Sequence, residues 1–220
     1  MDTPAASEAT SAAPAAYNLT GGLAAAAVGA ALFSLAFWAT SETGPVPVNW
    51  PEWTSTPVHL TALFALPLCL FWMGNGRMKP AGLLVIIVAM TAVHWLAMYE
   101  AIQIATANTS DASHNSGLMA GAAGGAIGAA GTWLVLMLMS RDFRTPKAIA
   151  LMLVSAVLLA LIGAYGIGVG SPSSLVALVT GAQFQSPELD PPSLTMSLYL
   201  PWQLVYGITL VKLFKSHRAG

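Results

Sequence analysis

The stretch AIALMLVSAVLLALIGAYGIGV, residues Ala148–Val169, decides the fold class of this chain. It carries no charged residue, and about 20 mostly apolar residues are what a helix needs to cross a bilayer. Its apolar residues are continuous rather than alternating, which excludes the strands of a membrane β-barrel. The lipid core contains no water to bond with free backbone N–H and C=O groups, so the stretch must be helical.

Working outward from this stretch, five further segments have a similar length and apolar character. We therefore expect an all-α fold, a polytopic membrane bundle of six transmembrane helices. The expected helices cover approximately Gly22–Thr40, Val58–Gly74, Ala81–Tyr99, Gly117–Ser140, Ala148–Val169 and Met196–Phe214. Pro67 in the second span and Pro201 in the sixth are expected to kink their helices and free backbone carbonyls.

The composition excludes a water-soluble domain. Hydrophobic residues make up 56% of the chain and charged residues 8%, whereas soluble domains carry about 25% charged residues. The net charge is −1 and no basic tract is present, so the expected partner is the lipid bilayer and not nucleic acid. The single cysteine, Cys69, excludes an intramolecular disulfide and a multi-cysteine metal site, and it lies in an apolar run where it should be inert.

The distribution of basic residues predicts the orientation. All eight fall in the loops after the second and fourth spans or around the end of the sixth: Arg77, Lys79, Arg141, Arg144, Lys147, Lys212, Lys215 and Arg218. The positive-inside rule makes that side cytoplasmic, so both termini are expected there. The chain then divides into a disordered tail (1–20), a transmembrane domain (21–214) and a short basic tail (215–220). The Ala- and Gly-rich helices favour a bacterial inner (plasma) membrane.

The fourth span carries two rows of glycines at intervals of four, which predict close helix packing. These glycines are Gly117, Gly121, Gly124, Gly125 and Gly128. The first span, with Gly22, Ala26, Gly29 and Ala30, is the expected internal partner. The alternative is a groove that receives another subunit of a membrane complex.

A few polar residues within or beside the spans are candidates for function, because such groups are costly in lipid. His94 should lie in the outer half of the bilayer, face the bundle interior and bond to a partner from the second or sixth span. The other candidates for binding a ligand or a proton lie toward the same side: His59, Glu100, Gln103, Tyr199, Gln203 and Tyr206. Together these residues predict a small polar pocket in the outer half.

Two roles for the histidines remain open beside that pocket. His59 and His94 come from adjacent spans, and such a pair can hold haem b, a metal or a quinone in an electron-transfer anchor. Haem ligation requires both rings at nearly the same depth, and the predicted depths differ by several ångströms. Alternatively, His94 and Glu100 relay protons during transport.

Catalytic motifs are missing from the sequence. It contains no G-x-S-x-G, no H-E-x-x-H and no phosphate-binding glycine loop followed by Lys and Ser or Thr. The sequence therefore favours a non-enzymatic membrane protein, either a small solute-handling (transport-related) protein or an accessory subunit of a membrane complex.

Overall fold

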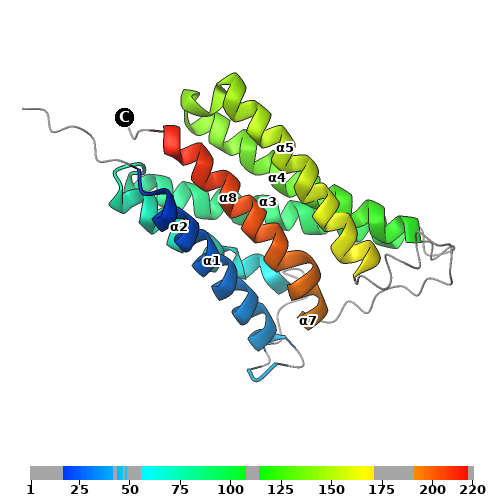
Figure 1. Ribbon diagram of the computed structural model, residues 1–220. Coiled ribbons are helices and arrows are strands. Elements are labelled where there is room, and N and C mark those ends of the chain that lie inside the picture. Colours follow the sequence, from blue (N-terminus) through cyan, green and yellow to red (C-terminus); the bar gives the residue numbers. More distant parts are fainter. Residues whose placement is uncertain are drawn as a thin grey trace, which may run out of the picture.

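Every regular element in the described part of the computed structural model is a helix (Figure 1). The structure describes residues 17–41, 44–46, 48, 56–107, 114–170 and 191–217. The predicted disordered tail lies outside this part up to residue 16, and α1 already begins at Leu19.

Helices occupy all six predicted positions. Their bounds are α1 Leu19–Thr40, η2 Thr56–Leu60, α2 Thr61–Gly74, α3 Pro80–Ala107, α4 His114–Met139, η3 Arg141–Arg144, α5 Pro146–Ala164, η4 Tyr165–Val169, α7 Pro191–Leu194, η5 Thr195–Tyr199 and α8 Leu200–Ser216. The helix of the third span runs eight residues past its predicted end at Tyr99, because residues 100–107 contain neither Gly nor Pro to stop it.

Four of these helices are long and apolar enough to cross a membrane: Leu19–Thr40, Pro80–Ala107, Ser116–Met139 and Pro146–Val169. The helix Val58–Gly74 is apolar but shorter. Large apolar side chains face outward along these helices, including Leu84 (64% exposed), Leu138 (70%) and Leu153 (63%). Such a surface suits lipid and would be unfavourable in water. The chain is therefore a helical membrane protein.

Helix α4 packs between α3 and α5, and its glycines explain how. A Cβ atom on Gly121 would lie 2.0 Å from the carbonyl oxygen of Gly163 in α5, and one on Gly125 would lie 2.3 Å from that of Leu159. The second row of glycines faces the other way, since a Cβ on Gly124 would lie 3.3 Å from Ala101 of α3. Glycine thus permits backbone contact on one face of α4 and close contact with small side chains on the other.

The expectation that the first span fills this glycine groove is wrong. Its Gly29 instead packs on α2, where a Cβ would lie 2.4 Å from the carbonyl oxygen of Phe64. The glycine spacing identified a tight contact, but α5 supplies its own small residue, Gly163, at the same depth as Gly121. That reciprocal pair brings the two backbones closer than a one-sided glycine face does.

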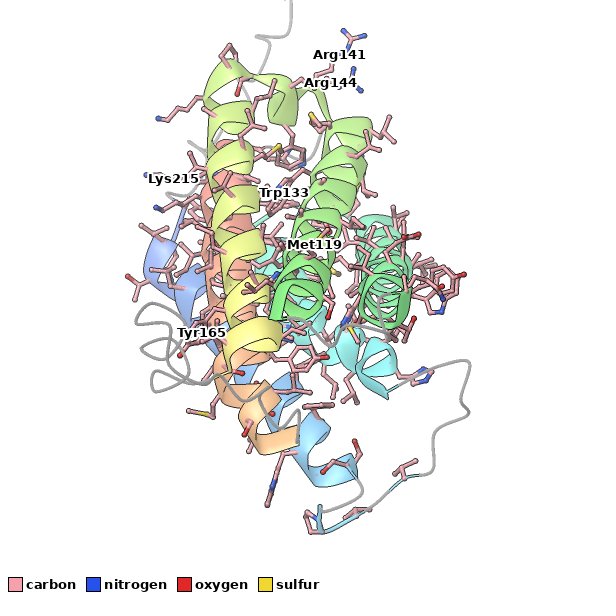
Figure 2. The ribbon with its side chains drawn as sticks, turned by 90° about the vertical axis from the view of Figure 1, so that its right-hand side faces the viewer. Met119, Trp133, Arg141, Arg144, Tyr165 and Lys215 are labelled. Atoms are coloured by element: carbon pink, nitrogen blue, oxygen red, sulfur yellow. The ribbon has the colours of Figure 1, made fainter. Side chains whose placement is uncertain are left out.

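The basic loops and the C-terminal end of α8 meet at one end of the bundle, hereafter the basic end (Figure 1). The Arg77 guanidinium donates to the backbone carbonyls of Lys215 and His217 and lies 5.4 Å from the ring centre of Tyr17. Tyr17 in turn donates to the Val211 carbonyl at 3.1 Å. Figure 2 shows Arg141 and Arg144 at this end, with Tyr165 far below them.

Helix α8 lies between α1 and α5 and is the last part of a composite helix (Figure 1). Residues 191–216 run without a break through α7, the π-helix η5 and α8. The π-turn closes with a bond from the Leu200 amide to the Thr195 carbonyl, immediately before Pro201. Proline cannot donate a backbone hydrogen bond, so the regular series of helical hydrogen bonds is already interrupted at Pro201. The wider π-turn lies at this interruption.

Candidate functional site

A cavity of about 80 Å³ lies among α1, α2, α3, α4, α8 and the π-helices η4 and η5. One water needs about 10–15 Å³, so this space holds several waters or one small solute. Its wall is mostly apolar, with polar groups at Thr61, His94, Thr132, Tyr199, Gln203 and Tyr206. A largely apolar cavity with a few placed polar groups is typical of small-molecule sites.

The cavity lies near the middle of the bundle, separated from the basic end by about two turns or more of each of three helices. On α3 its wall uses residues 90–101, while Lys79 precedes the start of that helix. On α4 it uses residues 121–132, the middle of the helix, and Arg141 lies nine residues beyond them. On the composite helix its wall residues fall between 198 and 206, well before Lys215. All three helices therefore place the cavity near their middles, at a distance from the basic end.

His94 faces this interior, and its partner comes from the second span as expected. Its Nδ1 atom lies 2.7 Å from the hydroxyl oxygen of Thr61 in α2. The imidazole also lies against Phe33 and Tyr199, with ring centres at 6.1 and 6.4 Å. Two aromatic neighbours and one hydrogen bond fix the ring at the cavity wall.

Gln203 is the most unusual group at the site. It is only 4% exposed, and within the described part of the chain its side-chain oxygen Oε1 has no hydrogen-bond partner. A buried acceptor that lacks a donor costs about 1–3 kcal/mol. Gln203 lines the cavity, but its oxygen exposes less than 1 Å² of surface, so a molecule inside the cavity does not reach that atom in this conformation.

A second polar pair closes the cavity toward the basic end. The Tyr206 hydroxyl donates to Thr132 at 2.5 Å, and Thr132 donates to the Gly128 carbonyl at 3.1 Å. The Tyr206 ring is stacked between Trp133 and Trp202, at 5.2 and 4.7 Å between ring centres. Trp133 projects into the bundle interior in Figure 2. The two hydroxyls of this wall are hydrogen-bonded and the rings are tightly packed, whereas the buried indole nitrogen of Trp133, like Gln203 Oε1, has no partner among the described residues.

The two π-helices meet beside the cavity. Ser197 of η5 donates to the Gly166 carbonyl of η4 at 3.4 Å, and a Cβ on Gly166 would lie 2.6 Å from that of Leu198. Ile167 of η4 and Leu198 and Tyr199 of η5 line the cavity. π-Helical turns occur frequently at functional sites, because they shift side chains out of the regular helical register.

The remaining predicted site residues do not join the cavity wall. His59 is exposed in η2, Gln103 is exposed on α3, and Glu100 is partly exposed one turn beyond Ala97. None of the three lines the cavity, whereas His94, Tyr199, Gln203 and Tyr206 do. Among the predicted packing glycines, Gly121, Gly124, Gly125 and Gly128 also line it.

Thr61, Thr132 and Trp202 belong to the site but were not predicted from the sequence. All three are ordinary residues of apolar helices when read alone. The signal available for Thr61 is its depth, because it lies two residues after His59, near the same end of the bundle as His94. A hydroxyl near the predicted depth of a lone histidine is a natural partner for it.

The site does not fit haem. Only one of the two proposed histidine ligands lines the cavity. Its volume of about 80 Å³ is also smaller than a cavity of about 150 Å³ that accepts benzene. Among the described residues, no three His, Cys, Asp or Glu side chains gather as a metal site.

Comparison with known proteins finds no matching family model, no similar curated protein and no similar solved structure. The function must therefore be argued from the cavity.

Proposed function

We propose that this chain is a non-enzymatic, six-span membrane protein with both termini in the cytoplasm, which handles a small solute in the cavity beside His94 and Gln203. The observation that carries the proposal is the mostly apolar cavity itself, with His94 held in its wall by Thr61. The bacterial inner membrane is the location we propose, because the chain is helical and its basic residues lie at one end.

Two helices complete the proposed count of six. The continuous helix 191–216 would be about 39 Å long at 1.5 Å per residue, which exceeds the roughly 30 Å of a bilayer core. Val58–Gly74 lies near the lower limit of about 17 residues for a spanning helix. Packing of α2 against α1 and α3 supports its passage through the same layer.

Cysteine labelling in intact cells tests the orientation. In a Cys69→Ala background, Thr106→Cys should react with an impermeant thiol reagent, because Thr106 is exposed at the end of α3 opposite Lys79. Asn75→Cys, exposed in the loop between α2 and α3, should react only after the cells are opened. The reverse pattern would overturn the orientation.

Ligand-detected NMR on the purified protein tests the solute site. A panel of urea, acetamide, ethanol and glycerol should contain at least one solute that receives saturation from the protein. Ala101→Met should abolish that signal, because Ala101 lines the cavity and is 5% exposed. Ala107→Met is the matched control on the same helix, since Ala107 is exposed and outside the cavity. Equal signals from the two variants, or none from the native protein, would contradict the proposal.

A further inference from the structure

We infer that the loop between α4 and α5 binds the headgroup of an anionic phospholipid through Arg141, Arg144 and Lys147. This inference goes beyond the solute site of the proposed function and does not depend on it. Three features of the described residues carry it: a cluster of cations without a carboxylate partner, an arginine that is already held in place, and apolar surface on the two helices that the loop joins.

The three cations lie close together in the sequence at the basic end, and all three are exposed. Arg141 and Arg144 are the first and last residues of the 3₁₀-helix η3. Such a helix has about three residues per turn, so side chains three positions apart lie on the same face. Figure 2 shows both arginines projecting outward at this end of the bundle. Lys147 follows three residues later, in the first turn of α5.

The acidic residue of this loop is directed elsewhere. Asp142 Oδ2 lies 3.0 Å from Nδ1 of His217, at the end of α8. Phe143 is 1% exposed and its ring lies 5.1 Å from that of Phe214, which fixes the turn against the bundle. Within the described part of the chain, none of the three cations forms an ion pair with a carboxylate. Their positive charge is therefore available to an anion from outside the chain.

Arg144 is positioned before any ligand binds. Its Nε atom donates to the Met137 carbonyl at 2.7 Å, near the end of α4. A guanidinium carries further N–H donors on its two Nη atoms, and these match two oxygens of a phosphate. Because the side chain is already held, binding restricts less of its freedom, which favours affinity.

Apolar side chains face outward on both helices that the loop joins. Leu138 in α4 is exposed and lies three residues before Arg141. Leu153 in α5 is exposed and lies within about two turns of Lys147. A phospholipid joins a charged headgroup to acyl chains, so one molecule can contact both the cations and the leucines, whereas a soluble phosphate compound has nothing to place on the apolar surface. The arrangement therefore favours a lipid.

Two phospholipids with the same acyl chains test this inference. Dioleoyl phosphatidylglycerol has a net negative headgroup, whereas dioleoyl phosphatidylcholine carries a cation beside its phosphate. Native mass spectrometry of the detergent-purified protein measures the affinity of the first lipid bound. One basic residue near an anionic membrane surface contributes about fivefold to binding. We expect the phosphatidylglycerol to bind at least about tenfold more tightly.

A triple variant assigns this preference to the loop. Arg141→Gln, Arg144→Gln and Lys147→Gln together remove its three positive charges at exposed positions. The two lipids should then bind about equally. The charge-retaining variant Arg141→Lys should keep most of the preference.

A matched triple variant separates a site from general attraction. Lys79→Gln, Lys212→Gln and Lys215→Gln remove the same charge from exposed positions of the basic end outside this loop. This variant should keep at least half of the preference. Equal losses in the two triple variants would overturn the inference, because the preference would then follow net charge.

Two further outcomes would also overturn the inference. One is equal binding of the two lipids to the native protein, a comparison that needs no variant to fold. The other is displacement of the phosphatidylglycerol by equimolar glycerol phosphate, because the partner would then be a soluble anion. Neither result would affect the solute site, which the ligand-detected NMR experiment tests separately.

Discussion

The two ends of the bundle are packed in different ways. At the basic end, the rings of Trp72 and Phe214 stack at 3.8 Å with an angle of 10° between them, and Phe143 lies 5.1 Å from Phe214. Arg77 secures the end of α8 through two backbone carbonyls. Farther from this end lie the cavity and the two π-helices, with Gln203 in the cavity wall.

This difference indicates that the two regions of the bundle have different roles. The basic end joins α2, the α4–α5 loop and α8 through stacked rings and backbone hydrogen bonds. The region around the cavity leaves space where these helices continue away from the basic end. Buried polar atoms without a partner among the described residues occur in both regions, at Trp72 Nε1 and at Gln203 Oε1, so the difference between the regions lies in the cavity and the π-helices.

The first prediction tests whether the region around the cavity is loosely packed throughout. Gly121→Leu should cause the largest loss of stability, because even a Cβ there would overlap the backbone of Gly163. Overpacking typically costs about 1–3 kcal/mol, and contact with backbone places this variant at or above the upper end. The readout is the melting temperature in detergent.

Gly74→Leu is the control for this substitution, because a Cβ at Gly74 meets nothing within 4 Å. It should leave the melting temperature almost unchanged. Unchanged stability in Gly121→Leu together with the loss of a co-purifying protein would instead assign the glycine face to a contact between subunits.

The second prediction compares aromatic residues from the two ends. Phe214 is 1% exposed and packs among other rings, whereas Trp202 borders the cavity. Truncation of a large core side chain costs about 3–5 kcal/mol in a water-soluble protein. Part of this cost is the free energy of moving the side chain out of water, and that part is absent in lipid. We therefore expect Phe214→Ala to cost roughly 2 kcal/mol. Trp202→Ala should cost less, because part of its surface already faces empty space. Denaturation in detergent measures both, and a larger loss for Trp202→Ala would contradict the contrast between the ends.

The positions of the helices were predictable from the sequence, because each depends on local composition. Continuous apolar runs, separated by Pro, Gly and charged residues, are sufficient to locate helices in lipid. The neighbours of each helix were not predictable in this way. Gly121 required a close partner, but the identity of that partner depended on the depth of Gly163, which lies 42 residues later in the sequence.

The site was partly predictable for the same reason. His94, Gln203, Tyr199 and Tyr206 were expected in one pocket, because polar groups in lipid avoid the outer surface. The sequence could not separate them from His59 and Glu100, since depth alone does not show which face of a helix turns inward. It also gave no indication of the π-turn before Pro201, which determines how Tyr199 and Gln203 are offset along α8.

The third prediction concerns the stability cost of the unpartnered oxygen of Gln203. Gln203→Met should raise the stability of the ligand-free protein, because it removes a buried acceptor that has no partner in the described structure. The expected gain is about 1 kcal/mol, at the lower end of the penalty for an unmet group. Gln103→Met, at an exposed position, should leave stability unchanged. A destabilised Gln203→Met would show that the oxygen is already satisfied, and the melting temperature in detergent distinguishes these results.

The smallest effect is expected at an exposed contact between a histidine and an aspartate on the basic end. His217 Nδ1 lies 3.0 Å from Asp142 Oδ2, and the Asp142 side chain is 45% exposed. Exposed pairs contribute about 0–1 kcal/mol, so Asp142→Asn should cost less than about 0.5 kcal/mol, and the difference should vanish in 1 M salt. The His217 ring remains held by its stack on Phe143, with ring centres 4.9 Å apart, and by its contact with Phe214. A loss as large as that of Phe214→Ala would mean that charge, rather than aromatic packing, holds the basic end together.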